Sequence, residues 1–205
     1  MAILKIYTFP DLVLAKKALP IARVEKRFHS LADSMLETMY DSPGVGLAAN
    51  QVGILERILV IDTEYEMDEL KDGEVPPEGS ELISGGVIRN KDPKIIINPE
   101  IILKEGSIMF SEGCLSVPEY SAEVKRAEKV KIQYQDIDGR TRTLSAEGLL
   151  AICIQHEVDH LDGKLFIDRL SPLKKETIRR RLKKERQERE IEERDEIESR
   201  LKKGR

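Results

Sequence analysis

The chain is poor in cysteine and histidine and has no long apolar run. Its 205 residues include two cysteines and three histidines. Cys114 and Cys153 form neither a C-x-x-C pair nor a disulfide framework, which favours a reducing compartment. No stretch reaches the roughly eighteen apolar residues of a transmembrane helix, and no basic-then-apolar leader opens the chain. These absences predict a cytoplasmic protein, neither secreted nor associated with a membrane.

The charge of the chain is unevenly distributed. The formal net charge of −4 indicates no class of partner by itself, and we expect no specific DNA partner. Residues 172–205 carry 14 basic and 9 acidic side chains, so this tail is net +5 and the remainder is −9. No glycine or proline lies between Leu173 and Lys203, which predicts one long charged helix with a thin apolar stripe.

Two interpretations of this tail remain open. It is either a solvated helix held by ion pairs four residues apart, or a contact for RNA or another acidic surface. The second role would fall to its basic first half, Lys174 to Gln187, which has eight basic and two acidic side chains.

The rest of the chain has the pattern of an α+β domain. Its length fits one domain over 1–170 and a helical extension over 171–205. Apolar residues at helical spacing predict an amphipathic helix over 24–41, with His29 on its polar side. Strands are expected at 57–62, 94–98, 129–135 and 140–144, the last two joined by a turn at Asp138-Gly139.

The connection between the first two strands, 63–93, is unusually long. It is acidic and contains Gly and Pro: from Glu64 to Glu81 there are eight acidic residues and one lysine. Because structureless connections of this length are uncommon in compact domains, we expect a mobile lid or a disordered insert.

The stretch His156-Glu157-Val158-Asp159-His160 carries the clearest chemical signal. Residues i and i+4 share a helix face, so both imidazoles can bind one metal ion, with Glu157 beside it to take a proton from water. A helix with two unrelated histidines is the plain alternative. The preceding residues 149–154 are apolar and predict a buried helix, in which unpartnered polar groups are costly. Asp159 either orients a ligand or pairs with a cation such as Arg126.

The H-E-x-x-H motif supplies two metal ligands and does not by itself identify the third. The extension H-E-x-x-H-x-x-G-x-x-H is followed as far as Gly163 but ends on Phe166. Glu176 and Glu185 are downstream candidates in the charged tail. Cys114, in Glu112-Gly113-Cys114-Leu115-Ser116, is a better one because a thiolate binds soft or borderline metals strongly, although a cysteine taken by itself is more often a buried structural residue.

A third segment, Gly44-Val45-Gly46-Leu47-Ala48-Ala49-Asn50-Gln51, has two glycines that allow a backbone to approach a ligand. Alone, it is also typical of a turn that opens a strand. In order, G-V-G-L-A-A-N-Q, E-G-C-L-S and Q-H-E-V-D-H-L-D-G resemble the three signature motifs of the peptide deformylase family. The resemblance covers most of residues 1–170. It implies antiparallel sheets packed around the H-E-x-x-H helix.

The resemblance also implies a reaction and its catalytic residues. The family removes the formyl group from the formyl-methionine of nascent polypeptides and releases formate. Cys114, His156 and His160 would hold the metal, and Glu157 would accept a proton from water. Gln51 and the backbone N–H of Leu115 would stabilise charge on the formyl oxygen.

Substrate contacts follow from the same resemblance. An apolar slot for the methionine side chain would be lined or backed by Val45, Phe110, Glu112, Leu149, Ile152, Cys153 and His156. Gly46 and Gly113 would hydrogen-bond the substrate backbone. Cys153 is then a packing residue.

The family resemblance also indicates which metal the site holds and a possible contact with the ribosome. Cys-His-His ligands would ordinarily indicate zinc. The family prefers Fe²⁺, with Ni²⁺, Co²⁺ or Zn²⁺ as substitutes. In some relatives a C-terminal helix docks on the ribosome, a role that the basic run beginning at Lys174 suits.

The chain departs from compact members by an insert of about twenty residues and by Ser121, where some relatives carry arginine. An H-E-x-x-H endoprotease and a binding protein with a structural metal are the rival readings.

Overall fold

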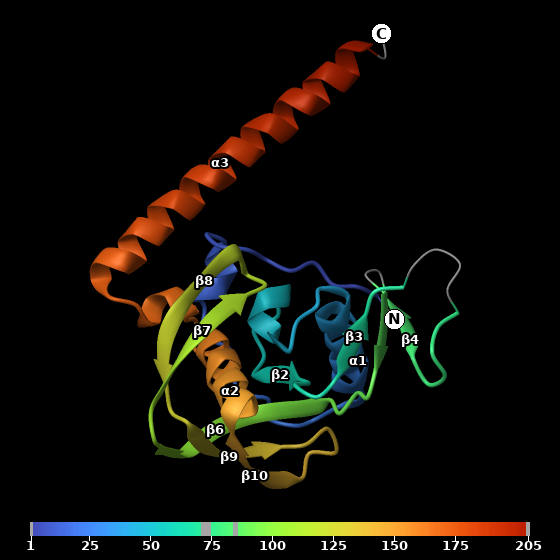
Figure 1. The fold of residues 1–205 in the computed structure, drawn as a ribbon, viewed down its shortest axis with the longest axis vertical. Coiled ribbons are helices and arrows are strands. Elements are labelled where there is room, and N and C mark those ends of the chain that lie inside the picture. The colour runs from blue at the N-terminus through green and yellow to red at the C-terminus, as the bar shows by residue number, and fades with distance from the viewer. Residues whose placement is uncertain (1, 71–74, 84–85, 204–205) are drawn as a thin grey trace. The chain divides into compact units, whose positions relative to one another are not determined.

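The computed structural model describes residues 2–70, 75–83 and 86–203, and the chain divides into two compact units, Met1–Phe166 and Ile167–Arg205. Helices and antiparallel sheets are combined, as predicted for an α+β protein (Figure 1).

The helices are α1 (Lys26–Asp41), α2 (Gly148–Leu161) and α3 (Pro172–Lys203), with short 3₁₀ helices at Leu12–Ala15, Ala49–Val52 and Phe166–Arg169. The strands are β1 (Gly46–Ala48), β2 (Ile58–Ile61), β3 (Glu66–Asp68), β4 (Glu81–Ile83), β5 (Gly86–Arg89), β6 (Lys94–Glu105), β7 (Ile108–Cys114), β8 (Val117–Arg126), β9 (Lys129–Gln135) and β10 (Thr141–Glu147).

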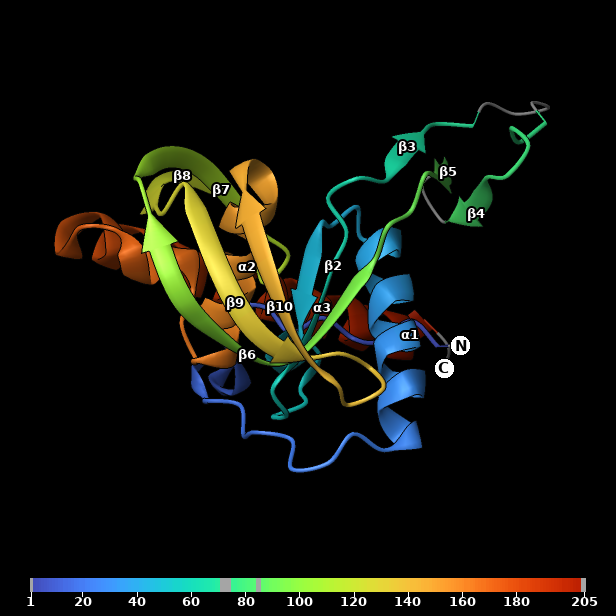
Figure 2. The ribbon, with the colours of Figure 1, turned by 90° about the horizontal axis from the view of Figure 1, so that it is seen from below.

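The main sheet has the strand order β1-β2-β6-β9-β10, and every pairing is antiparallel. Helices cover both of its faces, which Figure 2 shows for α1 and α2. Successive residues of a strand point to opposite faces, and all four residues of β2 are buried. Leu59 and Ile61 pack with α2, whereas Ile58 and Val60 pack with α1. A continuous apolar strand is therefore required at this position.

Helix α2 is buried along most of its length, as predicted. Every residue from Ala151 to Leu161 is buried, including the polar ones. Its apolar side chains, among them Ile154 and Leu161, pack on the main sheet. The expectation of burial is wrong at Leu149, which is 41% exposed in the first turn. The sheet therefore fixes α2 in place while its first turn stays open to solvent.

The amphipathic helix and the hairpin agree with the sequence pattern. Helix α1 begins two residues later than predicted, after the extended Glu25, and His29 is exposed as expected. The turn at Asp138-Gly139 joins β9 to β10. Strand β6 is much longer than the predicted 94–98, because the chain continues pairing with β9 beyond an irregularity between Ile97 and Glu100.

The insert is not structureless where it is described. Strands β3, β5 and β4 form a small antiparallel sheet in that order. The prediction of a disordered insert is wrong for these strands, while residues 71–74 and 84–85 lie outside the described residues. All three residues of β3 are exposed, so no apolar alternation marks the strand in the sequence. The hairpin of β7 and β8, which was also not predicted, carries Cys114 at its turn.

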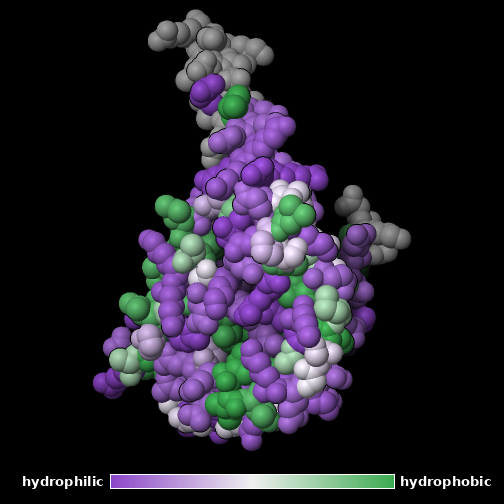
Figure 3. Space-filling model, turned by 90° about the vertical axis from the view of Figure 1, so that its left-hand side faces the viewer, coloured by the Kyte–Doolittle hydropathy of each residue, from purple (hydrophilic) through white to green (hydrophobic). Residues whose placement is uncertain are grey.

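The tail forms one helix, α3, as predicted. Ion pairs four residues apart join Arg180 to Glu176 and Arg181 to Glu185 along it. The side of this helix that Figure 3 shows is mostly hydrophilic. Leu173 and Ile191 are exposed apolar side chains on it. No helix in the described part of the chain is long and apolar enough to cross a membrane.

Candidate metal centre and substrate pocket

Helix α2 presents its two histidines to one point. His156 and His160 are four residues apart, and their Nε2 atoms lie 3.2 Å from each other. The rings meet edge to face with centroids 4.9 Å apart. Both side chains are buried, and that of His160 is almost completely shielded from solvent.

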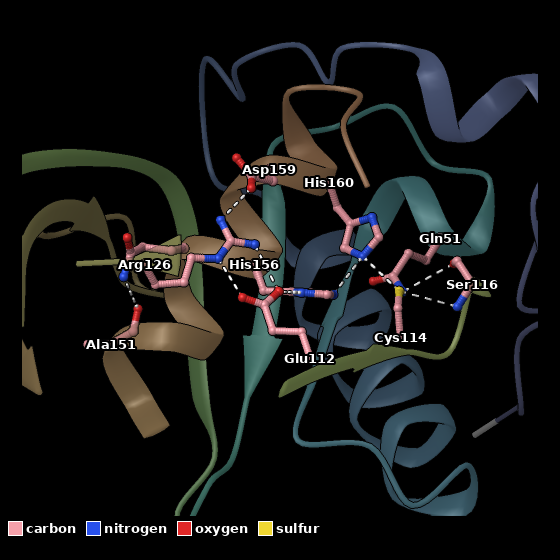
Figure 4. A network of polar contacts seen from close by, with 10 residues as sticks. Gln51, Glu112, Cys114, Ser116, Arg126, Ala151, His156, Asp159 and His160 are labelled. Carbon is pink, nitrogen blue, oxygen red and sulfur yellow. Dashed lines mark hydrogen bonds and ion pairs between the residues drawn. The ribbon is translucent and has the colours of Figure 1, made fainter. Parts of the chain in front are cut away.

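Cys114 completes this cluster from the end of β7. Its Sγ lies 3.2 Å from His160 Nε2, and the ligand atoms of all three residues lie within 4.8 Å of one another (Figure 4). The register of the hairpin shifts between Gly113 and Cys114, which turns the thiol toward α2. The Ser116 N–H donates to Sγ at 3.4 Å.

The cluster fits a transition-metal ion. Two ligands about 2.1 Å from one tetrahedral ion lie roughly 3.4 Å apart, close to the 3.2 Å between the two Nε2 atoms. Cys with two His is a donor set for a borderline metal, and three protein ligands leave a coordination position for water or substrate. The chemistry of the donors and their spacing therefore agree with a catalytic metal site.

A buried ionic network holds His156 in the orientation that a metal requires. His156 Nδ1 donates to Glu112 Oε2 at 2.8 Å, which leaves Nε2 with its lone pair toward the cluster. Arg126 donates to both oxygens of Glu112, at 2.6 and 2.9 Å, and to Asp159 Oδ2 at 2.6 Å. The predicted contact between Asp159 and Arg126 is thus confirmed, and it continues through Glu112 to a candidate ligand (Figure 4).

The surroundings move the pKa values of the two histidines apart. Burial opposes charge on His156, but hydrogen bonds with Cys114 and Glu112 raise its pKa well above the ordinary value. Burial, and then the charge of His156, lower the pKa of His160 well below the ordinary value. A divalent cation bound by these donors would therefore have to displace a proton from this cluster.

Glu157 is a buried carboxyl group beside the three candidate metal ligands. Burial raises its pKa to about 7, although the charge of His156 acts in the opposite direction. Its Oε2 has no hydrogen-bond partner among the described residues. A carboxyl group with a pKa near neutrality can both accept and return a proton.

Gly46 permits this placement of Glu157. A Cβ at position 46 would lie 2.5 Å from Glu157 Oε1 and 2.7 Å from Cys153 Sγ. Any side chain there would displace the carboxyl group or the thiol. The second glycine of the G-V-G motif is therefore explained by close packing.

Gln51 lies on the other side of Cys114. The Ala48 N–H donates to its Oε1 at 2.8 Å, which fixes the orientation of the side-chain amide. Its Nε2 then donates to Ser116 Oγ at 3.2 Å and to Cys114 Sγ at 3.7 Å. The amide donor is held rigidly next to the cluster.

These groups face a pocket of about 590 Å³. All of the predicted site residues except His160 line it: Val45, Gly46, Gln51, Phe110, Glu112, Gly113, Cys114, Leu115, Leu149, Ile152, Cys153, His156 and Glu157. His160 lies behind them and contributes its Nε2 to the cluster. Burial raises the pKa of the Cys153 thiol, and its Sγ is 3.5 Å from the Val45 carbonyl oxygen.

Comparison with known proteins places the chain in a family. The model of the polypeptide deformylase family matches residues 3–176. Peptide deformylase 2 of Xanthomonas campestris is 44% identical over 187 residues, which are 90% of this chain and 96% of that protein. The chain belongs to the polypeptide deformylase family.

Solved structures agree with this assignment. A peptide deformylase from Legionella pneumophila superposes with a TM-score of 0.72 at 40% identity, and covers 92% of this chain and 98% of its own. One from Ehrlichia chaffeensis, in complex with actinonin, has a TM-score of 0.74 at 37% identity, and covers 90% and 98%. Peptide deformylases are metal-dependent hydrolases that remove the formyl group of nascent peptides, and this chain is one of them.

The pocket includes residues that the sequence did not indicate: Pro43, Ser111, Val117, Pro118, Glu119 and Tyr120. Ser121, noted as a departure from some relatives, lines it as well. Most of them belong to the β7–β8 hairpin. The alternation of residues 117–126 would have been the signal for this strand. The bidentate pairing of Arg126 with Glu112 had no signal in the sequence, because the two residues are 14 positions apart on neighbouring strands.

Proposed function

We propose that Cys114, His156 and His160 hold one divalent ion, and that the pocket beside them binds the formyl-methionine end of a nascent polypeptide. The observation that carries this proposal is the convergence of three donors within 4.8 Å beside Glu157. When bound, such an ion supplies Lewis-acid activation of a water molecule at neutral pH. The remaining chemistry belongs to side chains of this chain.

Glu157 is the proton-transfer residue in this proposal. Its carboxylate accepts a proton as water adds to the formyl carbon, and it returns the proton to the amine when the C–N bond breaks. Formate and a free N-terminal methionine result. The pKa of about 7 supports both steps, because neither protonation state is strongly favoured at neutral pH.

Gln51 and Leu115 are proposed to stabilise the charge that develops on the formyl oxygen. The fixed side-chain amide of Gln51 and the backbone N–H of Leu115 flank Cys114 in the same pocket. The loss of one such donor typically costs about 3 kcal/mol of barrier, or about a hundredfold in rate.

Recognition of methionine is assigned to the apolar part of the pocket. Val45, Phe110, Leu149 and Ile152 supply its apolar surface, with Cys153 as a packing residue, and Glu112 and His156 close it. Gly46 and Gly113 are the proposed backbone contacts of the peptide. An exposed Leu149 agrees with this role, since an apolar side chain at a pocket mouth gains contact when substrate binds.

The identity of the metal ion, the extent of the catalytic domain and the ribosome contact are also proposals. We infer Fe²⁺ as the ion, with Ni²⁺, Co²⁺ or Zn²⁺ able to replace it at a Cys-His-His site. Residues 1–170 form the catalytic domain, and the basic half of α3 contacts the ribosome in the cytoplasm, where nascent chains emerge. The exposed lysines of this half support an electrostatic contact with an acidic surface.

The deciding experiment measures formate release from a short formyl-methionyl peptide by protein purified without oxygen in the presence of Fe²⁺ or Ni²⁺. Metal-dependent release is expected. The Cys114→Ala variant should lose both metal and activity. Retained metal in that variant, with cleavage of internal peptide bonds, would instead indicate an endoprotease with another third ligand.

A further inference from the structure

The root of the acidic insert lies against the rim of the deformylase pocket. Tyr65, near the start of the insert, donates its hydroxyl proton to the carbonyl oxygen of Gly44 at 3.1 Å. Gly44 lines the pocket together with Val45 and Gly46. The Tyr65 ring also packs edge to face on Tyr40, with centroids 5.0 Å apart. One residue of the insert therefore contacts the pocket wall directly.

This rim has no side chain at positions 44 and 46 that could anchor it. A Cβ on Gly44 would lie 2.9 Å from Leu115 Cδ1, and one on Gly46 would meet Glu157. The position of the rim consequently depends on hydrogen bonds to its backbone. The Gly44 N–H donates to the Met39 carbonyl at 2.9 Å, and the Gly44 carbonyl accepts from Tyr65.

Asp62 connects this rim to both ends of the insert. The carboxylate is fully buried. Its Oδ1 accepts from the N–H groups of Glu64 and Tyr65 at 3.0 and 3.2 Å. Its Oδ2 accepts from the Tyr40 hydroxyl at 2.6 Å and from the Asp92 N–H at 2.9 Å.

The backbone of Asp62 reaches the pocket rim as well, because its N–H donates to the Val45 carbonyl at 3.0 Å. A single residue thus joins the entry of the insert, its exit and the pocket wall. Because these hydrogen bonds hold Asp62, Tyr65 and Val45 in fixed relative positions, a shift of Tyr65 would also shift the pocket rim.

We propose that Tyr65 is a positioning residue for the deformylation reaction, which holds the backbone of Gly44 to Gly46 in the place where the formyl-methionyl peptide binds. The inference deepens the proposed function and depends on it. The acidic insert thereby contributes to substrate binding through its root, independently of the strands at its tip. Burial, and then Asp62, raise the pKa of Tyr65, so its hydroxyl stays protonated and can donate to Gly44.

The test compares Tyr65→Phe with the wild type in the metal-loaded, full-length protein. The substitution removes one hydroxyl and keeps the ring that packs on Tyr40. We expect KM for a short formyl-methionyl peptide to rise about fivefold, the effect of one neutral hydrogen bond. The value of kcat and the metal content should stay at the wild-type level, because Tyr65 touches neither the metal ligands nor Glu157. Tm should fall only slightly, by the loss of one half-buried hydrogen bond.

Two matched controls separate this effect from general damage. Tyr134→Phe removes a hydroxyl from another half-buried tyrosine, which does not line the pocket. Leu82→Ala truncates an exposed side chain in the strands of the insert's tip. Both should leave KM unchanged.

The outcomes are distinct. A wild-type KM in Tyr65→Phe would overturn the inference, and so would a lowered Tm without a change in KM, which would mean a structural role only. A KM raised equally by Leu82→Ala would also overturn it, because the effect would not be specific to the root. Absence of formate release by the wild type itself would instead contradict the proposed function.

Discussion

At the scale of single residues, the carboxyl group of Glu157 is the most specific prediction of the site. Glu157→Gln keeps the size of the side chain but cannot accept a proton. We expect formate release to fall by about a thousandfold, a typical contribution of general acid–base catalysis. Metal content should be unchanged, because Glu157 is not among the three converging ligands. Activity and bound metal are to be measured on the same preparation.

Glu119→Gln is the matched control for this substitution. Glu119 also lines the pocket, but it is exposed on β8 and is not adjacent to a metal ligand. It should retain most of the activity. Equal losses in the two variants would mean that pocket charge in general, and not proton transfer by Glu157, supports the reaction.

The site was predictable to different degrees, residue by residue. His156, Glu157 and His160 lie within one helical turn, so local spacing alone places them together. Cys114 is 42 positions before His156 in the sequence and was assigned through the family resemblance. The contact of Arg126 with Glu112 and that of Tyr65 with Gly44 were beyond reach, because they depend on which segments become neighbours and no local pattern encodes that.

Among the elements around the site, one buried arginine links the β7–β8 hairpin to α2. Arg126, on β8, is 3% exposed and joins Glu112 on β7 to Asp159 on α2. Arg126→Met would leave two buried carboxylates without their cation. Removal of one partner from such a network typically costs about 3–5 kcal/mol, so the free energy of unfolding should fall by that order. Urea denaturation of the metal-loaded protein measures it.

Lys129→Met is the comparison for an exposed ion pair. Lys129 and Glu147 join β9 to β10, and their side chains are 55% and 70% exposed. Water and salt already screen this pair, so we expect no measurable change in stability. If the two substitutions destabilised the protein equally, the burial of Arg126 would not be the reason for its importance.

Elements with a buried face were predictable, and exposed ones were not. Helix α1 and strand β9 alternate apolar and polar residues at their own periods, which the core imposes. Strand β3 is exposed at every residue and therefore has no such pattern. The end of β6 was missed for a related reason: its residues beyond Glu100 are mostly exposed.

At the scale of the whole molecule, the question is what the charged helix α3 adds to the catalytic unit. Lys174 and Lys183 are exposed in its basic half. We expect Lys174→Glu with Lys183→Glu to weaken binding to ribosomes. The slope of log affinity against log salt concentration should become shallower by about 0.7–0.9 per lost lysine–phosphate contact. Hydrolysis of a short formyl peptide should be unaffected, because neither lysine lines the pocket.

The matched control changes the net charge by the same amount, but at lysines outside α3. Lys17→Glu with Lys104→Glu reverses two exposed lysines of the unit Met1–Phe166. If both double variants bind ribosomes equally weakly, overall charge governs the association and α3 has no special part in it. If neither loses affinity, α3 is a solvated helix held by its own ion pairs, which was the alternative interpretation of this tail. Loss confined to the α3 variant would assign the ribosome contact to its basic half.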